Sequence, residues 1–106
     1  MASRVRAVVW SESAQRSLDE VIHYIANDSR SAAGRVLEAA LDVAASLTRL
    51  SARGRVVPEL DDPAIREVFV FDYRLMYRVE ETRVVVVAFL HGARDFANWR
   101  TKQGLE

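Results

Sequence analysis

The spacing of hydrophobic residues changes once along this chain, and that change constrains the fold more than any single motif does. Between Ala14 and Leu50, aliphatic residues recur three and four positions apart, which places them on one stripe of a helix. Between Ile65 and Leu90, short runs are instead rich in β-branched and aromatic residues, as strands are. The pattern predicts an α+β domain in which helices precede a sheet.

Two helices are expected in the first half of the chain. Ser11 is a suitable N-cap for the first helix, and the polar break at residues 28–31 supplies caps before the second. The second helix carries an alanine-rich stripe from Ala33 to Leu50, and Gly54 is expected to terminate it. Because the break is short, the pattern predicts an antiparallel hairpin of two helices.

Four strands are expected around this hairpin. The first lies within Val5–Trp10, and the others cover Ile65–Phe71, Tyr73–Val79 and Arg83–Leu90. Only short polar links separate the last three strands, so they are predicted to form an antiparallel meander. The segment from Val56 to Pro63 contains two prolines and paired aspartates, which favours an irregular loop or an edge segment.

Alternation along the strands indicates which side chains share a face. In the middle strand of the meander, Tyr77 is expected to pack on the helices, while Arg74 and Arg78 are displayed on the opposite face. Regular alternation in the last strand places Phe89 and His91 on one common side. Both sides of that strand are hydrophobic, so we expect it to be central in the sheet.

The length of 106 residues suits a single hydrophobic core. We expect one domain over residues 1–106, with residues 92–106 as a C-terminal tail that includes a short helix around Phe96–Lys102. The sequence has no cysteine, which excludes disulfides, thiol catalysis and cysteine-containing zinc sites. We expect no metal and no cofactor.

Charge and hydropathy bear on the partners and the cellular location that we expect for the chain. Its 15 basic and 15 acidic side chains cancel, whereas proteins that track phosphate backbones usually carry a basic excess. No signal-peptide pattern and no apolar run long enough for a bilayer is present. The expectation is a cytoplasmic protein that does not contact a membrane.

Five segments, taken in order, resemble the RelE/ParE superfamily of toxins from type II toxin–antitoxin systems. They read VVWSESAQRSLDEVIHYI, SAAGRVLEAA, GRVVPEL, IREVFVFDYRLMYRV and VVVVAFLHGARDF, and together they cover nearly the whole chain. The resemblance implies that the meander joins the first strand in one antiparallel sheet. It also implies a cognate antitoxin as partner, whose disordered tail folds on binding.

The resemblance leaves two activities open, because RelE-like members cut mRNA on the ribosome and ParE-like members poison DNA gyrase. The neutral charge, the glycine that follows His91 and the absence of a lysine cluster favour the ParE-like, plasmid-stabilisation branch. The favoured hypothesis is therefore a growth-arresting, noncatalytic inhibitor of gyrase whose binding surface includes the C-terminal tail. A non-toxic member that only binds its antitoxin is a further alternative.

The candidate site residues follow from the same resemblance. A ribosome-dependent mRNA endoribonuclease would use Glu59 as base, Arg74 as phosphate clamp and His91 near the end of the last strand. A binding surface is predicted to include four arginines: Arg66, Arg74, Arg78 and Arg94. Simpler structural roles are a pair of Glu59 with Arg55 or Arg66, a local pair of Arg94 with Asp95, and a Trp99 that anchors the tail.

Overall fold

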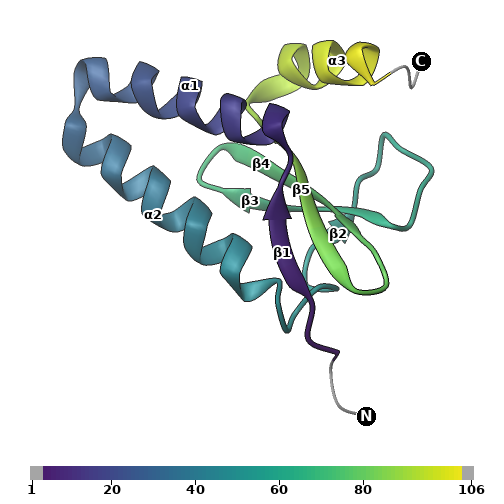
Figure 1. The fold of residues 1–106 in the computed structure, drawn as a ribbon. Helices are drawn as coiled ribbons and strands as arrows, with labels where there is room; N and C mark the ends of the chain where they lie inside the picture. Colours follow the sequence, from purple (N-terminus) through teal and green to yellow (C-terminus); the bar gives the residue numbers. More distant parts are fainter. Residues whose placement is uncertain (1–3, 104–106) are drawn as a thin grey trace.

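A sheet with helices on both faces forms the body of the protein (Figure 1). The computed structural model describes residues 4–103. Its elements are β1 (Ala7–Trp10), α1 (Glu12–Asp28), α2 (Arg30–Ser46), β2 (Arg55–Val56), β3 (Ile65–Val70), β4 (Tyr73–Val79), β5 (Arg83–Leu90) and α3 (Gly92–Lys102). The predicted α+β class, with a strand, a helical hairpin and a meander in that order, is confirmed.

Side-chain caps set the start of both helices of the hairpin. The hydroxyl of Ser11 accepts a hydrogen bond from the Ala14 amide at 3.1 Å, as predicted, and begins α1. Ser29 ends α1 and caps α2 through the Ala32 amide at 3.0 Å. With this single residue between them, the two helices diverge as a V in Figure 1. Helix α2 ends at Ser46, so Gly54 does not terminate it, contrary to expectation.

The sheet has the strand order β1-β5-β4-β3-β2. The strands β3, β4 and β5 form the predicted antiparallel meander, and β5 lies in the interior of the sheet, as expected. The predicted antiparallel pairing of the first strand is wrong, because β1 runs parallel to β5 with Ala7 opposite Arg83. The short β2 pairs with β3 at the other edge, within the segment predicted as loop or edge.

The parallel pairing of β1 follows from where the helical hairpin delivers the chain. After α2 the backbone returns to the beginning of β1, where the Arg6 amide donates to the Thr48 carbonyl at 2.9 Å. The short β2 runs back toward this end, so β3 starts from it in the direction of β1, β4 reverses, and β5 has the direction of β1 again. The third strand of the meander is β5, which therefore lies parallel to β1.

A bulge interrupts the alternation of β5. Met76 pairs with Ala88, but the next residue of β4, Tyr77, pairs with Val86, so Val87 is an extra residue without an opposite partner. Regular alternation therefore fails at this point. Val86 and, three positions later, Phe89 both belong to the core beneath the helical hairpin.

Each face of the sheet has its own core. The hairpin core joins α1 and α2 to one face and includes Leu18, Leu47, Leu75 and Tyr77. The second core lies on the opposite face and is built by residues of α3, the sheet and the loop between β2 and β3: Val57, Leu60, Ile65, Met76, Ala88, Leu90, Phe96 and Trp99. The tail of the chain thus forms a helix that closes the second core, and Trp99, 9% exposed, anchors it as predicted.

Tyr77 ties the loop after α2 to the sheet. Its hydroxyl donates to the Ser51 carbonyl at 2.8 Å and accepts from the Gly54 amide at 2.9 Å. A Cβ at position 54 would stand 2.5 Å from the Glu67 carbonyl oxygen and 2.7 Å from the Tyr77 hydroxyl. Gly54 is therefore required for the close approach of two backbone segments and not for ending a helix.

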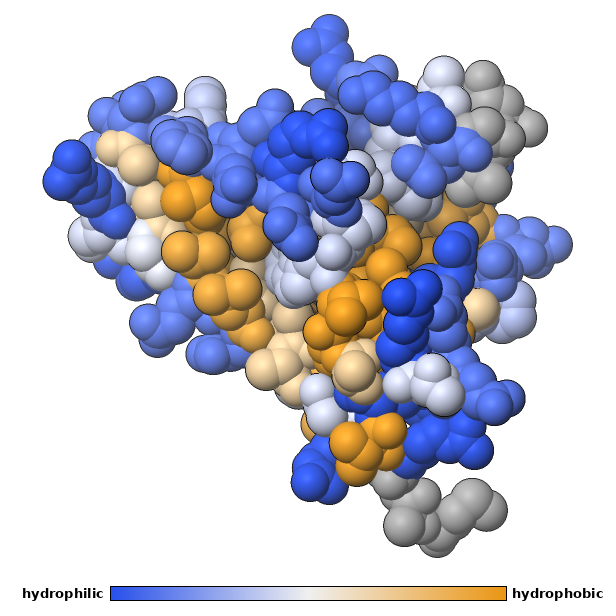
Figure 2. Space-filling model, in the orientation of Figure 1, coloured by the Kyte–Doolittle hydropathy of each residue, from blue (hydrophilic) through white to orange (hydrophobic). Residues whose placement is uncertain are grey.

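Hydrophobic side chains remain on part of the surface. Figure 2 shows them gathered in a band that crosses the face carrying α2 and β1. Val5 is 56% exposed, Leu41 48% and Val9 39%. Within residues 4–103, no helix combines the length and hydropathy that crossing a bilayer requires.

Candidate functional site

Arg74 lies buried between two carboxylates, on the sheet face opposite the helical hairpin. Its Nε donates to Glu67 Oε1 at 2.5 Å, and its two terminal nitrogens donate to the Glu59 carboxylate at 2.9 and 2.7 Å. The expectation that Arg74 is displayed on an open face is wrong, since only 9% of the residue is exposed. The reason is α3, whose Phe96 ring covers the guanidinium at 4.8 Å from Cζ to the ring centroid.

Glu67 is the most deeply placed charge of this network and was not singled out from the sequence. The residue is 2% exposed, and its second oxygen accepts from Arg55 Nε at 2.7 Å. A sequence signal exists, because Glu67 shares a face of β3 with Ile65, which is buried. A charged residue at a position that alternates with core residues requires a buried counter-ion.

The network of Arg55, Glu59, Glu67 and Arg74 contains two positive and two negative charges and is neutral as a whole. The hydrogen bond from Arg74 lowers the pKa of Glu59, and partial burial opposes this shift. The same hydrogen bond raises the pKa of Arg74 against the effect of burial. Both groups are therefore charged at neutral pH.

The two carboxylates differ in access to solvent. The Glu59 side chain is 41% exposed, whereas that of Glu67 is fully buried. An anion that takes the two terminal nitrogens of Arg74 as a bidentate ligand would have to displace Glu59, which now occupies them. In its present state the arginine has three of its five N–H donors on carboxylates.

His91 lies on the other side of the sheet from this network. Its ring packs on Tyr73 at 4.8 Å between centroids, and Tyr73 stacks on Phe89 of the hairpin core at 5.1 Å. Phe89 and His91, which follow the bulge at Val87, both lie on that side. The structure thus brings Glu59 and Arg74 together and leaves the His91 ring apart from them.

The remaining predicted arginines lie on separate surfaces. Arg66 donates to the Gly54 carbonyl at 2.7 Å and lies opposite Tyr77 in the sheet. Arg78 is exposed on β4, on the sheet face opposite the one that carries Tyr77. Arg94 is exposed in the first turn of α3. Asp95, in the first turn of α3, accepts from the amide of His91, the N-cap residue, at 3.1 Å. Within the described part of the chain, no three side chains of the metal-ligating types converge.

The strand, the helical hairpin and the mixed sheet are consistent with the fold of small α+β toxins of the RelE/ParE superfamily. A family model described as the ParE toxin of the type II toxin–antitoxin system, parDE, matches residues 8–96. The chain therefore belongs to the ParE toxin family, and the resemblance noted in its sequence is confirmed.

Comparison with solved structures agrees on the fold. The chain is similar to a protein from the structure titled "Chromosomal ParDE TA system from P. aeruginosa", with a TM-score of 0.68 and 15% sequence identity. The match covers 84% of this chain and 98% of that chain. No curated protein matches the sequence.

Proposed function

We propose that this toxin arrests growth by binding a protein target, DNA gyrase, without catalysing a reaction. One observation carries the proposal: the guanidinium that a nuclease would use as its phosphate clamp is neutralised by Glu59 and Glu67, which accept three of its five N–H donors. Cleavage of RNA through its 2′-hydroxyl builds charge on a phosphorane, and a free cation must stabilise that charge. A neutral, closed network does not supply one.

The position of His91 supports the same proposal. A catalytic acid or base must be within hydrogen-bond reach of the reacting atoms. The His91 ring packs against Tyr73 on the hairpin side of the sheet, while Arg74 lies beneath α3 on the other side. The surface that we assign to target binding is the outer side of α3, where Arg94 is exposed.

A ribosome-dependent nuclease is the second candidate, favoured by the direct contact of Glu59 with Arg74. In that case Glu59 would leave the guanidinium when a phosphate enters, and it would then serve as the base. Docking on the ribosome would also have to bring a second proton donor to the site. A non-toxic member that only binds its antitoxin would show neither activity.

We further propose that a cognate antitoxin covers the hydrophobic band on α2 and β1 in the cell. Exposed apolar residues that gather on one face mark interaction sites, and the exposed apolar residues of these two elements include Leu41 of α2 at 48% and Val9 of β1 at 39%. Coexpression with a candidate antitoxin tests this: L41E should lose copurification and R35E should retain it. Equal retention by both variants contradicts the assignment of this face.

Two assays on the purified protein separate the candidate functions. We expect inhibition of DNA supercoiling by gyrase and intact mRNA in a reconstituted translation reaction. The variant R94E should weaken supercoiling inhibition about tenfold, whereas R30E, the same charge change at an exposed position of α2, should not. Cleavage of mRNA within codons that R74Q abolishes would establish the nuclease instead.

A further inference from the structure

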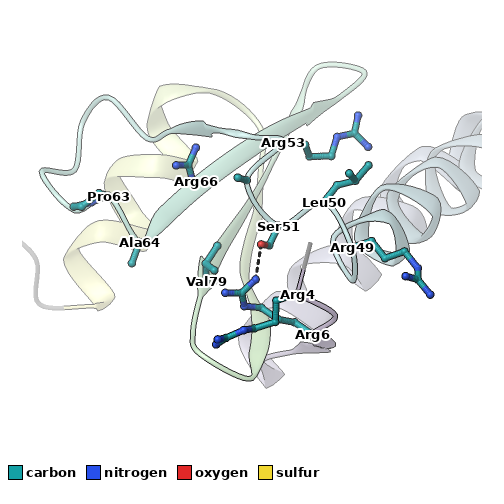
Figure 3. A pocket seen from close by; sticks show the side chains of 11 residues that line it. Arg4, Arg6, Arg49, Leu50, Ser51, Arg53, Pro63, Ala64, Arg66 and Val79 are labelled. Carbon is teal, nitrogen blue, oxygen red and sulfur yellow. Dashed lines mark hydrogen bonds between the residues drawn. The ribbon is translucent and has the colours of Figure 1, made fainter. Parts of the chain in front are cut away.

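Five arginines line one open pocket at the end of the sheet where β1 begins (Figure 3). They are Arg4, Arg6, Arg49, Arg53 and Arg66, and the pocket has a volume of about 1020 Å³. The walls come from the segment before β1, the loop after α2, and the ends of β3 and β4. No acidic side chain is among the described residues that line it.

Neutral acceptors, and not carboxylates, bind four of these five guanidinium groups. Arg6 donates from Nε to the Glu80 carbonyl at 2.7 Å and from Nη1 to the Ser51 hydroxyl at 2.9 Å. Three further arginines make one such bond each: Arg4 with the Glu81 carbonyl, Arg53 with the Ser46 hydroxyl and Arg66 with the Gly54 carbonyl. By contrast, Arg55, Arg74 and Arg83 are paired with glutamates.

This arrangement orients the cations without neutralising them. A carbonyl or hydroxyl partner fixes one N–H and leaves the positive charge and the other N–H groups of the guanidinium available to a ligand. Since the sequence as a whole has no net charge, five guanidiniums at one site that form no ion pair within residues 4–103 are a strong local asymmetry. Such a site favours an anion that can accept several charge-assisted hydrogen bonds.

The remaining wall of the pocket identifies the kind of anion. Apolar side chains take part in the lining, among them Leu50, which is 54% exposed, Pro63 and Val79. No aromatic ring on which a base could stack occurs among the lining residues of the described chain. Carboxylates that alternate with aliphatic side chains fit this lining better than a phosphate backbone does.

We propose that the pocket binds an acidic, apolar segment of a partner protein, with carboxylates on the arginines and aliphatic side chains on Leu50 and Val79. This site is separate from the Glu59 and Arg74 network and from the outer side of α3. It does not depend on whether gyrase is the target, because only the chemistry of the pocket enters the argument.

Binding of a labelled peptide to the full chain tests the proposal. The probe is a 12-residue peptide of alternating glutamate and leucine, followed by fluorescence anisotropy, with a lysine and leucine peptide and a 12-nucleotide oligo-dT as competitors. We expect the acidic peptide to bind and both R49E and R53E to weaken it at least tenfold. The control R16E changes the same charge at an exposed position of α1 and should leave affinity within twofold.

Specific outcomes overturn the proposal. No binding of the acidic peptide, or an equal loss in R16E, would show that the pocket is not a peptide site. Displacement of the peptide by oligo-dT at lower concentration than by unlabelled peptide would assign the pocket to nucleic acid. R49A and R53A, which remove a charge without reversing it, should also weaken binding, by less than R49E and R53E do. Thermal melting shows whether each variant is folded.

Discussion

Arg74 holds both carboxylate oxygens of Glu59 across a sequence separation of 15 residues, at 2.9 and 2.7 Å. Glu59 belongs to the loop between β2 and β3, so this pair fastens the loop against the second core. The same guanidinium satisfies Glu67 beneath it. One arginine therefore organises the loop, a buried charge and the packing of α3.

Removal of Arg74 should destabilise the protein strongly. R74A leaves the buried carboxylate of Glu67 with Arg55 alone, and breaking a buried ion pair typically costs about 3 to 5 kcal/mol. Chemical denaturation should show a loss close to the lower end of this range, because Arg55 remains. R78A, at an exposed position of the same strand, should stay within about 0.5 kcal/mol of the wild type.

A double variant tests whether the loss comes from the stranded charge. E67Q removes that charge, so R74A combined with E67Q should be more stable than the sum of the two single changes predicts. Simple additivity in the denaturation data would show that Glu67 and Arg74 are not coupled.

Two glycines should respond in opposite directions to alanine. G54A introduces a Cβ 2.5 Å from the Glu67 carbonyl, and overpacking of this kind costs about 1 to 3 kcal/mol. G34A adds a Cβ that meets nothing within 4 Å in α2, where alanine is favoured over glycine by roughly 1 kcal/mol. Thermal melting of both variants suffices, and a G54A protein as stable as the wild type would contradict the close approach described above.

Acid should remove the contribution of Glu59. The pKa of Glu59 is lowered in the folded protein from the ordinary value of 4.5, so the ionised side chain stabilises the fold above that pH. This contribution is lost as the pH falls through the lowered pKa. At neutral pH the wild type should be more stable than E59Q, and the difference in unfolding free energy should shrink below about pH 4.5. A difference that stays constant down to pH 3 (roughly a unit or more below the ordinary pKa) would refute the role of the charge.

Phe71 should tolerate asparagine better than valine. It has a φ of 54°, in the left-handed region, and it is the one non-glycine residue within 4–103 with positive φ. The ring is 63% exposed, so little packing is lost on substitution. F71N should keep or raise the melting temperature, while F71V should lower stability by about 1 kcal/mol, since β-branched residues are strained there. The opposite order would mean that the ring contributes more than its exposure indicates.

Local chemistry made much of the fold predictable. The hydroxyl caps, the 3.6-residue stripe and the short polar links each act between residues close in sequence, so Ser11, the hairpin and the meander were found without a structure. The direction of β1 depends on where a whole helical hairpin ends, and no local pattern encodes that. The prediction that Gly54 ends a helix is wrong, because the contact with Glu67 that requires a glycine joins segments distant in sequence and leaves no local signal.

The candidate site was harder to predict than the fold. The sequence suggests a catalytic role for Glu59 and Arg74 and a pairing of Glu59 with Arg55 or Arg66. It does not predict that Glu59 pairs with Arg74. Burial of Arg74 depends on α3, which adds a second core to a face that alternation alone would leave open. The sequence does contain a signal for Glu67, which shares a face of β3 with Ile65. A charged residue that alternates with a core residue in this way predicts a buried ion pair.

The bulge at Val87 lets β5 carry one residue more than the β4 segment with which it pairs. Beyond this extra residue, Phe89 faces the helical hairpin, and the His91 ring packs on the same side against Tyr73. A chain shorter by this one residue would pair without a bulge and would leave the imidazole where it is, because Ala88, Phe89 and Leu90 would keep Met76, Leu75 and Arg74 as their partners. The bulge is thus a point at which the strand tolerates a one-residue insertion or deletion without changing the face that either the histidine or α3 occupies.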